Sequence, residues 1–286
     1  MKLKQLTLAA LAAISLAACD EVDVNDRTTY VEPVKAQRSV LIEDFTGQAC
    51  INCPSATEMI HQLQANPNFG DKIIAVGIHS GGFSKRPPTY TKPFELWTAT
   101  GDEYFNYWKI SSQPKGIVNR RAPELNYEVW PQAVAAALES KTALEIDVEN
   151  SYDPQTRKLT VNTSLTCLQG TPSCLQGTPS VSGKLQLWIV QDNITAMQYF
   201  PGNVRDAAYV HNHVLRCAVN GTWGEEVTVK EGETLVLTHE TQLDETTMEQ
   251  GIGAPAYVPE DVSVVAFVYN DNGVENVAQA PAIGKE

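Results

Sequence analysis

Beyond its first eighteen residues the sequence lacks any long hydrophobic run, and it has little positive charge. No later apolar stretch approaches eighteen residues, which argues against a further membrane-spanning helix. Lysine and arginine number 21 against 34 acidic residues, for a formal net charge of −13, and such a balance repels nucleic acid and anionic headgroups. We therefore expect no nucleic-acid partner and no membrane attachment through charge.

The sequence also lacks the short motifs of several enzyme classes. It contains no P-loop, no dinucleotide-binding glycine fingerprint, no G-x-S-x-G nucleophile elbow and no HExxH zinc motif. His211 and His213 lie two residues apart on one predicted strand and hence on one face, but no third ligand is evident near them. We therefore predict neither a metal site nor a cofactor.

The first eighteen residues have the pattern of a secretory signal. Lys2 and Lys4 precede an uncharged, mostly apolar run over residues 6–18, which is too short to span a bilayer and typical of a signal core. The run ends in Leu-Ala-Ala-Cys19, which resembles the lipobox of bacterial lipoproteins, where the cysteine thiol receives the lipid. The resemblance implies a signal peptide at 1–18 and acylation of Cys19, with palmitate among the acyl chains. An ordinary signal peptide with a chance cysteine is the alternative.

Residues 19–38 are predicted to be a solvated tether. Four acidic residues lie within 20–26, and the segment shows no helical or strand period. Acidic residues directly after the acylated cysteine resemble the surface-export signal of lipoproteins in Bacteroidota, which implies the outer face of the outer membrane. A polar tether on the periplasmic side is the alternative. Two or three acyl chains, as mature lipoproteins carry, anchor a protein stably where one chain does not.

If Cys19 carries lipid, an odd number of cysteines remains to form disulfides. The six are Cys19, Cys50, Cys53, Cys167, Cys174 and Cys217. Residues 167–173 and 174–180 both read CLQGTPS, so a tandem duplication has copied one cysteine together with its loop. In an oxidising compartment we therefore predict a disulfide between Cys217 and either Cys167 or Cys174. The inward register of Cys167 on its predicted strand favours it modestly.

Between residues 39 and 141, short buried strands alternate with helices, which is typical of an α/β fold. The predicted strands cover 39–45 and 72–79, and a third short strand follows Pro114. The predicted helices run from about Cys53 to Ala65, around 101–110 and over 130–140. We interpret 39–141 as one domain.

From residue 142 onward the period changes to two. Apolar and polar residues alternate along 144–149 and 158–167. Further candidate strands lie at 184–191, 209–219, 226–230, 234–239 and 261–270, separated by turn signals. Because no helical period intervenes, the pattern predicts an antiparallel β-sandwich domain over 142–286.

A CxxC motif, Cys50-Ile-Asn-Cys53, sits where the first strand turns into a helix. At a helix N-terminus the unpaired amides and the macrodipole favour the thiolate, so Cys50 could attack a disulfide and Cys53 could resolve it. With Pro114 before a later strand, the order of elements resembles the thioredoxin fold, which implies that Pro114 is a cis-proline beside the motif. Ala49 and the Ile-Asn dipeptide depart from the usual thioredoxin residues. A disulfide that merely pins the turn is therefore an equal alternative, whereas zinc is disfavoured because no second CxxC lies nearby.

Three segments carry a resemblance over nearly the full mature chain: VLIEDFTGQACINCP at 40–54, YVHNHVLR at 209–216 and NGTWG at 220–224. They resemble the 28 kDa outer-membrane lipoprotein family of Porphyromonas and other Bacteroidota, thioredoxin-like at the front with a β domain behind. The resemblance implies a surface-exposed adhesin or receptor, with a protein partner or host-surface ligand. We favour this binding role because surface export removes a protein from the systems that recycle redox cysteines. The alternative is a membrane-tethered thiol–disulfide oxidoreductase acting through Cys50 and Cys53.

Overall fold

The computed structural model describes residues 37–85, 95–168, 180–244 and 254–284, all within one compact unit, Pro33–Glu286. The predicted signal peptide, Cys19, most of the tether and Cys174 lie outside the described residues. Arg38, where the solvated tether was predicted to end, is only 8% exposed, and its guanidinium donates to the carbonyl oxygen of Val274 at 2.7 Å. The folded part thus includes Arg38. No helix in the described ranges is long and apolar enough to cross a bilayer.

The described chain forms strands throughout, whereas its α-helices all lie in the first half. The strands are β1 (Val40–Thr46), β2 (Ile73–His79), β3 (Lys115–Val118), β4 (Arg121–Leu125), β5 (Leu144–Asp153), β6 (Lys158–Cys167), β7 (Ser180–Gln191), β8 (Ile194–Phe200), β9 (Val204–His211), β10 (Val214–Ala218), β11 (Glu225–Lys230), β12 (Thr234–Gln242), β13 (Val262–Asn270) and β14 (Gly273–Pro281). The α-helices are α1 (Cys53–Gln64), α2 (Ala99–Tyr107) and α3 (Trp130–Glu139). Short 3₁₀ turns occupy Gly70–Lys72, Tyr127–Val129, Pro201–Asn203 and Pro259–Asp261.

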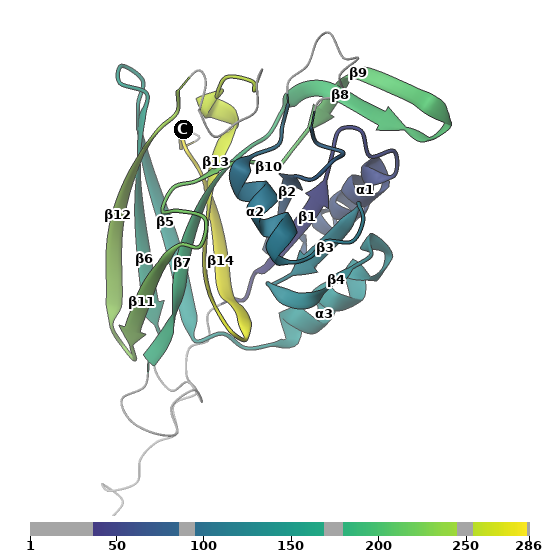
Figure 1. Cartoon of the computed structure of the whole chain (residues 1–286). Helices are drawn as coiled ribbons and strands as arrows, with labels where there is room; N and C mark the ends of the chain where they lie inside the picture. The colour runs from purple at the N-terminus through teal and green to yellow at the C-terminus, as the bar shows by residue number, and fades with distance from the viewer. Residues whose placement is uncertain (1–36, 86–94, 169–179, 245–253, 285–286) are drawn as a thin grey trace, which may run out of the picture. The chain divides into compact units, whose positions relative to one another are not determined.

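One mixed sheet runs through both predicted domains. Its order is β14-β13-β7-β10-β2-β1-β3-β4, with β11 also paired to β7 (Figure 1). β1 and β2 are parallel, whereas β3 pairs antiparallel to β1 and β4 antiparallel to β3. Strand β10 joins β2 where Val214 pairs with Gly77. The division into 39–141 and 142–286 stays a prediction from the sequence pattern, but the sheet continues across it.

A second, three-stranded sheet of order β12-β6-β5 gives the C-terminal part its sandwich character. Along β13, Val262, Val264 and Ala266 face the core shared with β5 and β6, because side chains alternate between the two faces of a strand. Val265 and Phe267 face the opposite side, toward α2. Figure 1 shows the two sheets lying face to face, away from α1 and α3.

Helices cover both faces of β1 and β2. Val40 and Ile42 pack in one core with side chains of α1 and α3, including Ala56 and Trp130. The intervening Leu41 packs in a different core with Tyr104 of α2 and with residues of β7 and β13. The same alternation places Asp44 on the α1 face and Glu43 on the α2 face, and both carboxyl groups are buried.

The prediction of one strand over 209–219 is wrong, because the structure has two strands there. β9 ends at His211 and β10 begins at Val214, with His213 between them at a left-handed φ of 56°. β8 and β9 form a hairpin that was not predicted, and it projects from the sheet (Figure 1). A bulge between Leu215 and Cys217 also turns these two side chains toward different cores.

The β3–β4 turn carries a buried charge. Asn119 and Arg120 both have left-handed φ values, 51° and 52°, at a place where hairpin turns favour Asn-Gly. The Arg120 Nε lies 3.4 Å from Oε1 of Glu43, and both side chains are almost fully buried. Five aromatic rings have centroids 4.2–5.8 Å from the guanidinium carbon: Tyr104, Trp188, Trp223, Phe267 and Tyr269. Arg120 thereby ties the helix-bearing part of the sheet to β7 and β13.

Candidate functional site

Cys50 and Cys53 are disulfide-bonded at the turn between β1 and α1. The Cys50 amide donates to the carbonyl oxygen of Gly47 at 3.0 Å, and the Cys53 amide donates to that of Cys50 at 3.3 Å. α1 begins at Cys53 with Pro54 in its first turn, a position that proline suits because the first helical amides have no partner within the helix. Both sulfur-bearing residues are buried, at 3% and 1% exposed.

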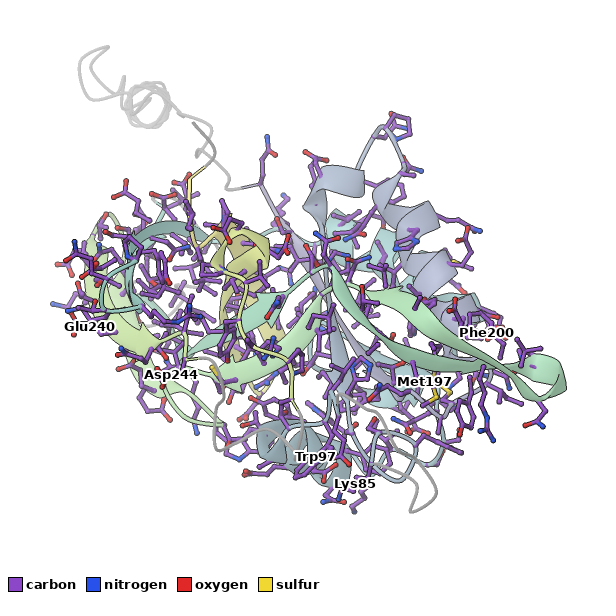
Figure 2. The ribbon with its side chains drawn as sticks, turned by 90° about the horizontal axis from the view of Figure 1, so that it is seen from above. Lys85, Trp97, Met197, Phe200, Glu240 and Asp244 are labelled. Atoms are coloured by element: carbon purple, nitrogen blue, oxygen red, sulfur yellow. A yellow bond between two sulfur atoms is a disulfide. The ribbon has the colours of Figure 1, made fainter. Side chains whose placement is uncertain are left out.

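The β8–β9 hairpin covers this disulfide. The Gln198 side-chain amide donates to the carbonyl oxygens of Cys50 at 2.9 Å and Gly47 at 3.4 Å. The Tyr199 amide donates to the carbonyl oxygen of Gln48 at 2.8 Å, and the Gln48 side chain donates back to that of Met197 at 3.2 Å. Figure 2 shows Met197 nearer the sheet and Phe200 nearer the tip of the hairpin. No strand was predicted here, because the residues of β8, ITAMQYF, do not alternate regularly between apolar and polar.

Pro114, the third predicted site residue, follows a cis peptide bond and directly precedes β3. The neighbouring Gln113 side chain donates to the carbonyl oxygens of Thr46 at 2.6 Å and Ser80 at 3.1 Å. These bonds hold the proline segment beside the carboxyl ends of β1 and β2. The disulfide turn leaves β1 at the same end, so the structure brings this segment and the CxxC to one end of the sheet.

A small cavity of about 30 Å³ lies against Cys53 on the α1 face of β1 and β2. Asp44 of β1, His79 of β2 and His211 of β9 line it, and they are 2%, 4% and 5% exposed. The rings of His79 and His211 have centroids 5.3 Å apart. No local sequence pattern marks this set, because it depends on the pairing of β10 with β2, which brings the end of the hairpin to His79.

The three groups facing the cavity are held away from their charged forms. Burial raises the pKa of the Asp44 carboxyl to about 8. Burial, and secondarily the neighbouring His211, lowers the pKa of His79 well below its ordinary value, and burial lowers the pKa of His211 to about 4. Asp44 Oδ1, His79 Nδ1 and His211 Nε2 have no hydrogen-bond partner among the described residues. At neutral pH the Asp44 carboxyl and the rings of His79 and His211 are therefore mostly uncharged.

The expectation that His211 and His213 share one strand face is wrong. The break between β9 and β10 puts them on different segments, although both line the small cavity, and His213 Nδ1 lies 3.1 Å from Asp192 Oδ1. No group of three or more histidine, cysteine or acidic side chains is arranged to hold a metal ion within the described ranges.

The remaining predicted disulfide involves the sandwich core. Cys167 is buried in that core, and Cys217 packs against the same cluster, where the Tyr257 hydroxyl donates to its sulfur at 3.6 Å. Cys174 lies outside the described residues. The pairing of Cys217 with Cys167 or Cys174 therefore stays a prediction. Cys167 and Cys217 contact the same core.

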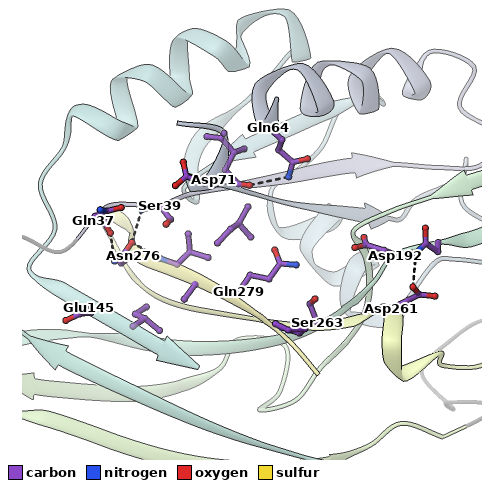
Figure 3. A pocket seen from close by; sticks show the side chains of 18 of the residues that line it. Gln37, Ser39, Gln64, Asp71, Glu145, Asp192, Asp261, Ser263, Asn276 and Gln279 are labelled. Carbon is purple, nitrogen blue, oxygen red and sulfur yellow. Dashed lines mark hydrogen bonds between the residues drawn. The ribbon is translucent and has the colours of Figure 1, made fainter. Parts of the chain in front are cut away.

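A much larger hollow of about 1020 Å³ lies on another part of the surface (Figure 3). Its lining includes five carboxylates and no lysine or arginine: Asp71, Glu145, Asp192, Glu260 and Asp261. Polar groups that line the hollow form hydrogen bonds with one another. The Asn193 side-chain amide donates to the Asp261 carboxylate at 2.7 Å, and the Ser39 backbone amide donates to the Asn276 side-chain oxygen at 3.0 Å. No cysteine lines this hollow, so its size does not make it the centre of any thiol chemistry.

The sequence profile of the outer membrane protein Omp28 family matches residues 101–286. The chain belongs to the Omp28 family. Family membership places it among outer-membrane proteins, as the sequence analysis expected. The matched part of this Omp28 protein includes Pro114 and His211, whereas Asp44, His79 and the disulfide precede it. No curated protein sequence matches the chain.

Among solved structures, the Omp28 protein is similar to HBP35 of Porphyromonas gingivalis, with a TM-score of 0.61 and 14% identity over 86% of this chain and 75% of that one. At this identity the likeness shows a shared fold. Spo0M, a sporulation control protein from Bacillus subtilis, matches with a TM-score of 0.29 and 13% identity over 48% of this chain and 47% of its own.

Proposed function

We propose that this Omp28 protein is a lipid-anchored outer-membrane protein whose first folded part is a thioredoxin-like thiol–disulfide oxidoreductase. The observation that carries the proposal is the fully buried Asp44 carboxyl, with its raised pKa, at the cavity that Cys53 also lines. A disulfide that only pins a turn needs no ionisable group beside it, whereas a cysteine that gains and loses a proton does.

The order of elements supports a thioredoxin-like assignment for the first folded part. β1, α1, β2, α2, β3, β4 and α3 follow one another, and the strands lie in the order β2-β1-β3-β4. The CxxC precedes the first helix, and Pro114 precedes β3, as the resemblance drawn from the sequence implies. The alternation along β1 then places the Asp44 side chain beneath the disulfide turn.

The reaction is an exchange of two electrons between dithiol and disulfide. A thiolate of the partner attacks Sγ of Cys50, the Cys50–Cys53 bond breaks, and Cys53 leaves as a thiolate that takes up a proton. The second thiolate of the partner then attacks the sulfur that the partner contributed to the mixed disulfide. Cys50 is released and takes up the second proton, while the partner becomes a disulfide. The protein is reduced by two electrons and the partner is oxidised by two.

Access to the disulfide requires the cover to move. Cys50 is 3% exposed, so a partner thiol reaches its sulfur only when the β8–β9 hairpin lifts from the turn. The exposed Ile51, at 45%, lies within the CxxC and supplies an apolar contact for the approaching partner. A two-stranded ribbon held by a few hydrogen bonds opens more easily than a packed core does.

The anchor and the location belong to the same proposal. The lipobox-like end of the signal segment supports acylation of Cys19, and the acidic residues after it support export to the outer surface. The adhesin or receptor role, which the sequence favours, is here the second candidate. Surface export, which separates a protein from the systems that recycle redox cysteines, favours that role. The burial of Cys50 and Cys53 favours it too, because a sealed disulfide suits a structural pin. Protease shaving of intact cells tests the location, since a fully protected protein is not displayed outside.

A redox titration of the full-length protein separates the two functions. We expect the Cys50–Cys53 pair to have a potential above about −300 mV, since structural disulfides generally lie below that value. We also expect the reduced Cys50 thiol to be alkylated with a pKa below about 8.5, the ordinary value for cysteine. A lower potential together with an inert Cys50 contradicts the oxidoreductase and leaves the binding role.

A further inference from the structure

We propose that a hollow lined by parts of α2, β7 and β13 binds a neutral oligosaccharide, with the rings of Tyr107 and Trp223 as its stacking surface. The hollow has a volume of about 1340 Å³ and shares no lining residue with the two cavities described above. Its lining includes no cysteine and no residue of the disulfide turn. A ligand bound here therefore does not depend on the proposed redox function.

The size and place of the hollow suit a chain of several sugar rings. Sites for single small molecules usually enclose about 300–1,000 Å³, and this hollow is larger. Its lining comes from the end of α2, from β4, β7 and β11, and from the turns that follow β3 and β13. The helix-bearing part and the sandwich thus both contribute to it, and ligand sites often lie at such junctions.

Aromatic side chains supply much of the lining. Among the described residues they are Tyr107, Trp108, Trp223 and Tyr269. Tyr107, the last residue of α2, is 60% exposed, so core packing does not account for the position of its ring. Its ring centroid lies 4.6 Å from that of Trp223. The C–H groups on one face of a sugar ring carry partial positive charge, which matches the negative face of an aromatic ring.

Trp223 is held in place by the protein itself. Its indole nitrogen donates to Glu103 Oε1 at 2.6 Å, and its carbonyl oxygen accepts from the Tyr269 hydroxyl at 2.8 Å. The loop that carries Trp223 is fastened at Asn220, whose side-chain amide donates to the carbonyl oxygen of Leu185 at 2.8 Å. A surface whose side chains are already fixed loses less conformational entropy when a ligand binds.

The charges around the hollow favour a neutral ligand. Three cationic and three anionic side chains of the described residues line it: Arg120, Arg121, Lys184, Glu103, Glu226 and Asp271. Arg120 is paired with Glu43, and Lys184 Nζ lies 3.7 Å from Glu226 Oε1. A ligand with a net charge of either sign gains little from this balanced set. The net charge of −13 on the whole chain also repels anions.

The polar side chains of the lining match sugar hydroxyls. Asn106, Ser182 and Asn272 are exposed there. An amide or a hydroxyl side chain both donates and accepts hydrogen bonds, as each sugar hydroxyl does. A protein partner is the competing occupant, but the cores of protein interfaces are depleted in charged residues. The six charged side chains of this lining therefore favour the sugar.

The test uses the full-length protein in a detergent without a sugar headgroup. The probes are a printed array of neutral and sialylated glycans and a printed array of short peptides. Calorimetry then measures the affinity for the neutral glycan with the strongest signal. The variants are Tyr107→Ala, Tyr107→Phe, Trp223→Ala and Trp223→Phe. Phe83→Ala is the matched control, because Phe83 is an aromatic residue that is 49% exposed and does not line the hollow.

We expect the wild type to bind a neutral glycan and each alanine variant to bind it at least roughly tenfold more weakly, because aromatic anchors dominate many binding sites. Tyr107→Phe should keep most of the affinity, since the ring remains. Trp223→Phe should lose part of it, since the hydrogen bond to Glu103 is lost. The glycan should also shift the tryptophan fluorescence of the wild type, and the shift should shrink in Trp223→Phe. Phe83→Ala should bind as the wild type does.

Three results overturn the proposal. The first is that no neutral glycan binds, and the second is that only sialylated glycans or peptides bind. The third is that Tyr107→Ala keeps the wild-type affinity. Tyr107 is exposed, so its alanine variant should fold even if Trp223→Ala does not, and the comparison then rests on Tyr107. An inert Cys50–Cys53 pair contradicts the oxidoreductase and leaves this glycan site untouched.

Discussion

The side-chain amide of Gln198 donates to the carbonyl oxygen of Cys50 at 2.9 Å, so the β8–β9 hairpin is fastened directly to the turn that carries the disulfide. Gln198 is 3% exposed, and the same amide also donates to the carbonyl oxygen of Tyr199 at 3.1 Å. One buried side chain thus couples the cover of the site to the covalent bond beneath it. Under the proposed function, we expect the strength of this coupling to set how often a thiol reaches Cys50.

Replacing Gln198 by alanine should therefore expose the disulfide. A buried hydrogen bond contributes about 0.5–1.5 kcal/mol, so losing the contacts to Cys50 and Gly47 should accelerate reduction by about tenfold. The measurement is the rate of reduction by a water-soluble phosphine. Gln62→Ala is the control, because Gln62 is exposed on α1 and donates only to Glu58. An unchanged rate in Gln198→Ala would mean that the hairpin is not the barrier.

Asp44→Asn should stabilise the oxidised protein at high pH. The pKa of Asp44 is raised from 3.8 to about 8, so above pH 4 the unfolded chain releases a proton that the folded chain keeps. Stability from this group is complete below pH 4 and is lost as pH rises through 8. The asparagine variant avoids this loss of folding stability, which is roughly 5 kcal/mol between pH 4 and pH 8. Urea unfolding at pH 4 and pH 8 measures it, with exposed Asp147→Asn as the control. Equal curves for the variant and wild type at pH 8 contradict the buried carboxyl.

His211 predicts the opposite dependence. Its pKa is lowered from 6.5 to about 4, so below pH 6.5 the unfolded chain takes up a proton that the folded chain does not. Its stabilising effect is complete above pH 6.5 and is lost as pH falls through 4, by about 3 kcal/mol. His211→Gln should remove that part of the acid sensitivity. The difference between variant and wild type, taken at each pH, cancels the Asp44 contribution, and a difference that stays constant from pH 7 to pH 4 would contradict the prediction.

Local sequence patterns were enough to predict the elements around the CxxC and Pro114. The apolar strand before Cys50, the helix after Cys53 and Pro114 before β3 are all properties of short segments, and the structure has these elements within a few residues of the predicted bounds. The sandwich strands were likewise visible from alternation. Asp44 was part of a quoted segment, but nothing local marked it as buried beside the cavity.

The second half of the site is not local. His79 and His211 meet only because β10 pairs with β2 at Gly77, and that pairing follows from a break at His213 that the sequence pattern did not show. The bulge before Cys217 had the same effect on the predicted register, since one extra residue moves a side chain to the other face. Both the meeting of His79 with His211 and the register of Cys217 depend on how strands pair across the predicted domain boundary. The sequence of a single segment contains no signal for that pairing.

Cys19→Ser tests the anchor. If Cys19 carries the lipid, the serine variant should lose acylation, because serine has no thiol to receive the lipid. Labelling of cells with a palmitate analogue should mark the wild type and not the variant. Cys174→Ser is the matched control, and it should remain acylated. Labelling of Cys19→Ser at the wild-type level would contradict lipid attachment at this residue.

Arg120→Ala should be among the most destabilising single changes in the described chain. The substitution leaves the Glu43 carboxyl buried at 0% exposed without its cation, and burial raises the pKa of Glu43 while Arg120 opposes that rise. Removing one partner of a buried ion pair costs about 3–5 kcal/mol, and the five surrounding rings lose their cation as well. Arg121→Ala, one residue along, removes an exposed side chain and should cost less than about 1 kcal/mol. Pairing Arg120→Ala with Glu43→Gln should recover part of the loss, because a neutral amide is cheaper to bury than an unpaired carboxylate. If denaturant unfolding shows the two arginine variants to be equally stable, Arg120 does not tie the helix-bearing part to the sandwich.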